Sequence, residues 1–219
     1  MKKVAILGTA ETWKEFPRDD SFEIWALNDM YKIISGCNRW FEMHNTEFIK
    51  LWTPSNCTKP HIEFLKELNI PIYMLNSIPE LETSVTYPLE KIIEHFGRQY
   101  FKSSVDYMIA LALYEGFEEI HVYGVNMAVD EEYSYQRPSC EYWLGRAEGM
   151  GVKIHLPESC DLLKRYYLYG YKDDEQTAFQ TKATAKIESM NTAADEYQKN
   201  YYMAMGAKSA WEQIKKESK

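Results

Sequence analysis

The chain has 219 residues and a formal net charge of −8. That length suffices for one well-buried α/β domain with an appendage, or for two small domains. The acidic net charge argues against a protein that binds nucleic acid through an overall positive charge. A local basic groove is still compatible with this composition, so the charge disfavours nucleic acid as a partner without excluding it.

No apolar run approaches the length that spans a bilayer, and the amino terminus lacks the apolar core of a signal peptide. Lys2 and Lys3 are followed by a short apolar run that ends at Gly8, which is typical of a strand. We therefore expect a cytoplasmic protein without a membrane span.

Four cysteines are widely spaced and form no Cys-x-x-Cys pair, which predicts free thiols, no metal site and no catalytic cysteine. The unusual part of the composition is aromatic, with 17 Tyr, 9 Phe and 6 Trp. Tyr and Trp bury apolar area while keeping a polar group, so they suit ligand crevices and subunit interfaces as well as cores.

Strand-like and helix-like patterns alternate to about residue 170, which predicts a mostly parallel sheet. A first strand ends at Leu7, and the other expected strands are 22–27, 39–43, 71–75, 119–123 and 152–156. The expected helices are 59–68, 89–96, 103–114 and about 139–149. We expect a loop around Pro79 and Pro88. The predicted fold is α/β, with a Rossmann-like domain over residues 1–171 that has helices on both faces of its sheet.

A helical arm is expected over residues 172–219, where strand-like runs vanish and the chain becomes polar and alanine-rich. Apolar residues follow a 4-3 spacing along it, at Ala183, Ile187, Met190, Ala194, Tyr197, Tyr201 and Ala204. Gly206 is expected to bend or break this helix. A single helix cannot bury its stripe alone, so the arm packs on the α/β domain, on its own second half or on another subunit. We favour a helical hairpin or a homo-oligomerisation arm over a long coiled coil.

Polar residues follow the first strands of the predicted sheet, at the edge where an open α/β sheet binds ligands. Gly8 and Thr9 end the first strand, where glycine lets the backbone approach a phosphate or ribose and the hydroxyl donates to it. One glycine is not a G-x-G-x-x-G fingerprint, so a dinucleotide is not indicated. The alternative is an ordinary turn between a strand and a helix.

The second and third strands end in Asn28, Asp29 and His44. An amide or carboxylate after the second strand suits ribose hydroxyls or a base edge, although Asn is also a common turn residue. Glu42 and His44 are two residues apart in an extended chain, so both point to the same side. His44 suits a general base or a phosphate donor, and a hydrogen-bonded structural histidine is the alternative.

Two further segments offer groups for an anion. Ser103 and Ser104, beside Lys102, precede the clearest helix and form a ready anion site, although a serine cap needs no ligand. Loop 127–138 follows a strand's carboxyl end, where active-site lids usually lie. It offers Arg137 to clamp an anion and tyrosine rings for stacking, or it seals a sheet edge instead.

The segments 1–9, 27–31, 103–113 and 116–126 resemble the bacterial lipooligosaccharide sialyltransferases. The resemblance covers roughly residues 1–126 and implies a crevice for a cytidine nucleotide. It also implies an inverting transfer without metal, with the nucleotide or nucleotide-sugar as ligand and no separate cofactor. The residues that it implies around the nucleotide are Gly8, Thr9, Asn28, Ser103 and Ser104, with Gly124 and Asn126 at the next strand's end.

The chain departs from that family at three places. The loop of residues 8–12 reads Gly-Thr-Ala-Glu-Thr where the family has Gly-Asn-Gly-Pro-Ser, and Val105 replaces the glycine of Thr-Ser-Gly. The family's catalytic histidine lies in the late loop, and residues 127–153 contain no histidine. His44 or Glu141 must then act as the base. The whole chain also resembles uncharacterised bacteriophage-encoded proteins, which would place it in a host cell's cytoplasm.

The resulting functional expectation is a nucleotide-binding protein that transfers a sugar from a nucleotide-sugar. His44 is the expected base, and Ser103, Ser104 and Arg137 are expected to hold the leaving phosphate. Two alternatives belong to other classes: a phage-type module that binds and sequesters a nucleotide without chemistry, and a structural or assembly protein.

Overall fold

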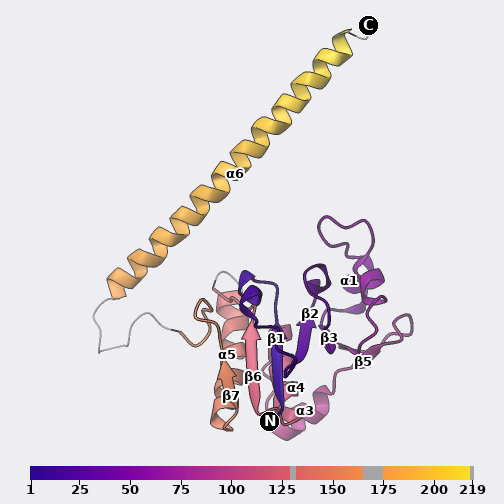
Figure 1. The fold of residues 1–219 in the computed structure, drawn as a ribbon, viewed down its shortest axis with the longest axis vertical. Coiled ribbons are helices and arrows are strands. Elements are labelled where there is room, and N and C mark those ends of the chain that lie inside the picture. Colours follow the sequence, from indigo (N-terminus) through magenta and orange to yellow (C-terminus); the bar gives the residue numbers. More distant parts are fainter. Residues whose placement is uncertain (129–131, 165–174, 218–219) are drawn as a thin grey trace. The chain divides into compact units, whose positions relative to one another are not determined.

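The computed structural model describes residues 1–128, 132–164 and 175–217, which fall into two units. The first unit, Met1–Lys164, is an α/β domain. In the second, Arg165–Lys219, the described residues form one helix, α6 (Glu175–Glu217) (Figure 1).

The described residues of the first unit form a seven-stranded sheet in the order β5-β4-β3-β2-β1-β6-β7. All neighbouring strands pair in parallel. The strands are β1 (Lys3–Leu7), β2 (Glu23–Leu27), β3 (Arg39–Glu42), β4 (Ile72–Met74), β5 (Ser84–Thr86), β6 (Glu119–Tyr123) and β7 (Lys153–His155). The Rossmann-like α/β fold is therefore confirmed.

Strand β5 lies in the segment where a loop was expected. It is the edge strand of the sheet and has no apolar pattern, because its three residues are held by backbone pairing with β4 and none of them is buried. The turn before it is closed by the Ser84 hydroxyl, which accepts from the Ile78 amide and donates to the Ile78 carbonyl. A strand held in this way carries no periodic signal in the sequence.

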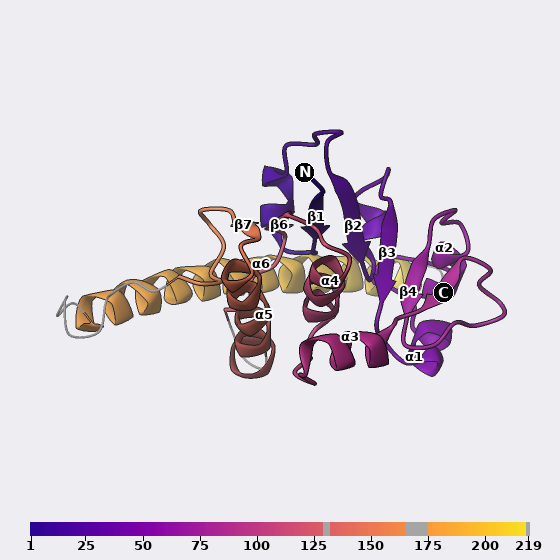
Figure 2. The ribbon, with the colours of Figure 1, turned by 90° about the horizontal axis from the view of Figure 1, so that it is seen from below.

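Both faces of the sheet are covered, which explains why its central strands are apolar almost throughout. Val4 and Ile6 point into a core that includes α3, α4 and α5, and Figure 2 shows these helices on one side of the sheet. Ala5 and Leu7 point into a second core with residues of α1 and α2. The helices are α1 (Thr46–Leu51), α2 (His61–Leu65), α3 (Leu89–Phe96), α4 (Ser104–Tyr114) and α5 (Arg137–Gly149).

The ends of β1 and β6 approach each other more closely than side chains allow. A Cβ atom on Gly8 would lie 2.4 Å from the carbonyl oxygen of Gly124, and one on Gly124 would lie 2.0 Å from that of Gly8. Gly124 also has φ +69°, a conformation that other residues adopt at a cost. Both positions therefore require glycine.

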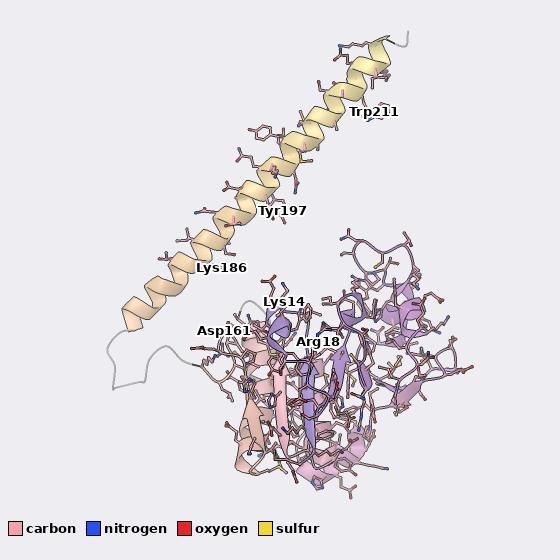
Figure 3. All side chains as sticks on the ribbon, in the orientation of Figure 1. Lys14, Arg18, Asp161, Lys186, Tyr197 and Trp211 are labelled. Atoms are coloured by element: carbon pink, nitrogen blue, oxygen red, sulfur yellow. The ribbon has the colours of Figure 1, made fainter. Side chains whose placement is uncertain are left out.

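Helix α6 runs without interruption from residue 175 to 217, so the expected break at Gly206 is wrong. A glycine inside a helix costs only about 1 kcal/mol relative to alanine, which its helix-forming neighbours outweigh. The continuous helix also rules out the expected hairpin within the described part of the arm. Tyr197 and Trp211 project from it, with 77% and 71% of their surface exposed (Figure 3). Homo-oligomerisation through this arm stays a prediction.

Among the described residues, no helix combines the length and the apolar character that crossing a membrane requires.

We expect Gly8→Ala to lower the free energy of unfolding by about 1–3 kcal/mol, because the new methyl group overlaps the Gly124 carbonyl. Gly124→Ala should cost more, since it adds the strain of a positive φ. Gly145→Ala is the matched control: Gly145 is exposed within α5 and its Cβ would meet nothing within 4 Å. The control should gain about 0.5–1 kcal/mol. Urea denaturation measures all three variants, and wild-type stability of Gly8→Ala would contradict the close approach.

Candidate functional site

The carboxyl ends of β1, β2, β3 and β6 surround an open crevice of about 700 Å³. This volume lies within the usual range for small-ligand sites. Most of the residues that the sequence suggested for a site line it: Gly8, Thr9, Asn28, His44, Ser103, Ser104, Gly124 and Asn126. Topology brings them together, since parallel strands present their carboxyl ends at one edge of the sheet.

The floor of the crevice is backbone held in place by hydrogen bonds between the ends of β1 and β6. The Gly8 amide donates to the Tyr123 carbonyl at 2.8 Å, and the Ala10 amide donates to the Gly124 carbonyl at 2.9 Å. The hydroxyl of Thr12, itself buried, accepts from the Gly124 amide at 2.8 Å. Thr9 is exposed at the crevice. The turn is thus fixed by backbone contacts.

Asn28 lines the crevice and carries an unpaired buried acceptor. It directly follows β2 and lies in the left-handed region, with φ +51°, which asparagine tolerates better than most residues. Its backbone is paired, because its amide donates to the Phe41 carbonyl and its carbonyl accepts from the Trp40 indole. Its side-chain Oδ1 atom is buried and has no hydrogen-bond partner among the described residues. A buried acceptor of this kind costs about 1–3 kcal/mol until a donor reaches it.

The next residue, Asp29, is not among the described residues that line the crevice. Its carboxylate binds the ammonium group of Lys32 at 2.9 Å, across one turn of a short 3₁₀ helix, Met30–Lys32. We therefore leave Asp29 out of the proposed site.

The start of α4 forms one wall of the crevice. Ser103 caps the helix in a capping box with Asp106. Asp106 is fully buried and accepts from the amides of Lys102 and Ser103 and from the hydroxyls of Ser103 and Ser139. Burial raises the pKa of Asp106, and these hydrogen bonds oppose the rise. Because Asp106 occupies the Ser103 hydroxyl, the groups left for a ligand are the Ser104 hydroxyl and the first amides of the helix.

His44 also lines the crevice, and its side chain is 43% exposed. The Glu42 carboxylate, which is fully buried at the end of β3, accepts from His44 Nδ1 at 2.5 Å and from the His44 amide at 3.2 Å. Its other oxygen lies 2.6 Å from Nε2 of buried His61. The predicted side-by-side placement of Glu42 and His44 is thus present in the structure.

These hydrogen bonds shift the pKa values of both Glu42 and His44. Burial works to raise the pKa of Glu42, but the hydrogen bonds from His44 and His61 outweigh it and hold that pKa below its usual value. The hydrogen bond to Glu42 raises the pKa of His44, and partial burial opposes the rise. The contact therefore favours the ionised form of Glu42 and the charged form of His44.

Arg137 and Glu141 lie outside the crevice lining formed by the described residues. Buried Arg137 pairs with Glu141 at 2.8 Å, one helical turn along α5. The guanidinium also donates to the Asp161 and Lys164 carbonyls, and Glu141 accepts from the Leu163 amide. The pair fastens this later segment to α5, which gives it a structural role that the sequence reading did not foresee.

Sequence reasoning also missed residues of the site. Residues 129–131 of the predicted loop 127–138 lie outside the described residues, and residues 132–136 form one π-helical turn that leads into α5. Met127 and Gln136 line the crevice. Nothing in the sequence indicated that His61 contacts Glu42, because His61 belongs to another element, 19 residues further along the chain.

No known protein-family model matches the chain, and no curated protein matches it. Solved structures of the sialyltransferase CstII from Campylobacter jejuni are similar to it. The complex with the substrate analogue CMP-3FNeuAc has a TM-score of 0.45 at 19% identity, over 71% of this chain and 80% of that one. The complex with cytidine-5'-monophosphate has a TM-score of 0.46 at 18% identity, over 84% and 99%. The sequence suggested a resemblance to sialyltransferases, and these similar structures are of a sialyltransferase.

We expect Glu42→Gln to lower the pKa of His44, because the carboxylate that stabilises the imidazolium becomes a neutral amide. NMR titration of the histidine ring protons measures this pKa. Glu47→Gln removes the same charge from an exposed position of α1 near His44 and serves as the control. Equal shifts in the two variants would show that the effect is general electrostatics and that the short contact contributes nothing.

Proposed function

We propose that the crevice binds a nucleotide, and that the protein transfers a sugar from a nucleotide-sugar to an acceptor hydroxyl. The observation that carries the proposal is the pairing of complementary groups across one crevice. Asn28 offers an unpaired buried acceptor, and the start of α4 offers donors for an anion. A nucleotide carries hydroxyl or amino donors at one end and a phosphate at the other.

The parts of a nucleotide can be assigned to these groups. A ribose hydroxyl or an exocyclic amino group would donate to Asn28 Oδ1. The phosphate would lie at the start of α4, where the Ser104 hydroxyl, the free amides and the Lys102 ammonium favour an anion. Between them, Gly8 and Gly124 form a floor without side chains, which lets the ligand approach the backbone.

His44 is placed to act as the base in such a transfer. With its Nδ1 bound to Glu42, its Nε2 atom is the one left to accept the proton of an acceptor hydroxyl. The acceptor oxygen then bonds to the anomeric carbon of the sugar, whose bond to the phosphate oxygen breaks. The nucleotide leaves with that electron pair, and the start of α4 stabilises its negative charge. Glu42 stabilises the imidazolium that forms.

One observation favours a second function, nucleotide binding without chemistry. Glu42 raises the pKa of His44, which favours the imidazolium form. An imidazolium donates to a phosphate but cannot abstract a proton. In this alternative His44 and the start of α4 hold one phosphate from two sides.

Asn28→Gly tests the nucleotide assignment, because glycine keeps the positive φ and removes only the side chain. We expect a nucleotide that binds the wild type to bind this variant about threefold to tenfold more weakly, the effect of one lost hydrogen bond. Without ligand, the variant should be at least as stable as the wild type, since it loses an unpaired buried acceptor. Asp29→Ala is the control and should bind normally. Calorimetry with a panel of nucleotides and nucleotide-sugars measures the affinities, and absence of binding by every one of them would reject both functions.

The variant His44→Gln distinguishes a sugar transferase from a protein that only binds the nucleotide. If His44 is the base, this variant should keep its affinity for the nucleotide within a few-fold and lose product formation by about 10²–10⁴-fold. Chromatography of the products after incubation with a bound nucleotide-sugar and candidate acceptors measures the rate. Binding without any product in the wild type would support the non-catalytic alternative.

A further inference from the structure

Two polar residues, the half-buried Tyr31 and the buried His61, are connected to His44 and have no part in the mechanism above. The Tyr31 hydroxyl lies 2.6 Å from His61 Nδ1, and His61 Nε2 lies 2.6 Å from Glu42. Glu42 and His61 are fully buried, whereas His44 reaches the crevice. The four side chains therefore form one chain of hydrogen bonds from the second core to the crevice.

The direction of each hydrogen bond follows from its partners. An ionised carboxylate only accepts, so His61 Nε2 and His44 Nδ1 must both carry a proton and donate to Glu42. A neutral His61 that is protonated at Nε2 has its lone pair on Nδ1, which accepts from the Tyr31 hydroxyl. Burial raises the pKa of Tyr31, so the hydroxyl keeps its proton. Each of these donors then has one acceptor, and His44 Nε2 has no hydrogen-bond partner in the part of the chain that the structure describes.

We propose that Tyr31 and His61 are positioning residues, which hold the Glu42 carboxylate in one orientation and thereby keep His44 in the tautomer with a free Nε2. The free Nε2 is the form that the transfer above requires of its base, so the functional meaning of the inference rests on the proposed function. The geometric inference stands on the four side chains alone.

The packing around His61 fixes the position of this chain of hydrogen bonds. The His61 amide donates to the Trp52 carbonyl at 2.9 Å, and the Trp52 ring lies 5.0 Å from the imidazole. The Tyr31 ring stacks on Phe64 at 4.8 Å and 9°. A Glu side chain by itself has three rotatable bonds. The aromatic contacts hold His61 in place, and its hydrogen bond to Glu42 keeps the carboxylate from rotating.

The alternative is that His61 only fills space and satisfies Glu42. In that case Glu42 would still face His44 when His61 is replaced, because the His44 amide and Nδ1 both point at the same oxygen. If His61 is a positioning residue, the carboxylate must change its orientation when His61 is replaced. Without His61 the second oxygen of Glu42 is buried and unpaired, at a cost of about 1–3 kcal/mol, which drives the carboxylate to turn away from His44.

Long-range ¹H–¹⁵N NMR spectra of the full chain test the inference, because the nitrogen shifts of a histidine ring report its tautomer. Above the pKa of His44, the wild type should show His44 protonated at Nδ1 alone. His61→Phe should lose this single tautomer and give a mixture. His61→Gln, whose amide can donate to Glu42, should restore it. His95→Phe, which changes a histidine of α3, is the control and should leave His44 unaltered.

An unchanged His44 tautomer in a folded His61→Phe would overturn the role of His61. If that variant does not fold, Tyr31→Phe decides, since it removes a single hydroxyl. The His61 Nδ1 shift should then move and the His44 tautomer should become mixed, and an unaltered His44 would reject the inference. These spectra contain no nucleotide, so their outcome is independent of whether the crevice binds one.

Discussion

The arrangement of the candidate site depends on the close approach of two backbones at Gly8 and Gly124. The space between them excludes even a methyl group, since a Cβ on either residue would lie within 2.4 Å of the other's carbonyl oxygen. This contact joins the ends of β1 and β6, two neighbouring strands whose carboxyl ends border the crevice. It gives the crevice a floor of backbone, and Asn28, His44 and the start of α4 line the same crevice.

Two buried carboxylates then determine which polar groups remain for a ligand. Asp106 lies under the start of α4 and occupies the Ser103 hydroxyl and two amides, which leaves Ser104 at the crevice. Glu42 lies at the end of β3 and occupies Nδ1 of His44, which leaves Nε2. Each carboxylate is stable in the interior because several donors surround it. In both cases a buried acid orients a group at the surface of the crevice.

The sequence predicted the elements whose signals are local. The apolar runs of β1 and β2 indicate strands that are covered on both faces, and the capping residues of α4 mark its start. Strand β5 was missed because its backbone pairing leaves no side-chain pattern. Arg137 had the right chemistry to bind an anion and Glu141 to act as a base, but they pair with each other and with residues 161–164, which no spacing relates to them. Gly206 was expected to bend or break the helix, but it lies within the continuous helix α6, because the residues around it are strong helix formers.

The alternation of strands and helices, the polar strand ends and the Glu42–His44 pair follow from the sequence by itself, because periodicity and near neighbours along the chain encode them. Only the tertiary structure decided which of these groups face a common crevice and which are occupied elsewhere. The buried Asn28 acceptor and the path from Tyr31 through His61 to Glu42 join residues on different elements. Hydrogen bonds between such elements depend on how the sheet and its helices pack, and packing leaves no repeating pattern in the sequence.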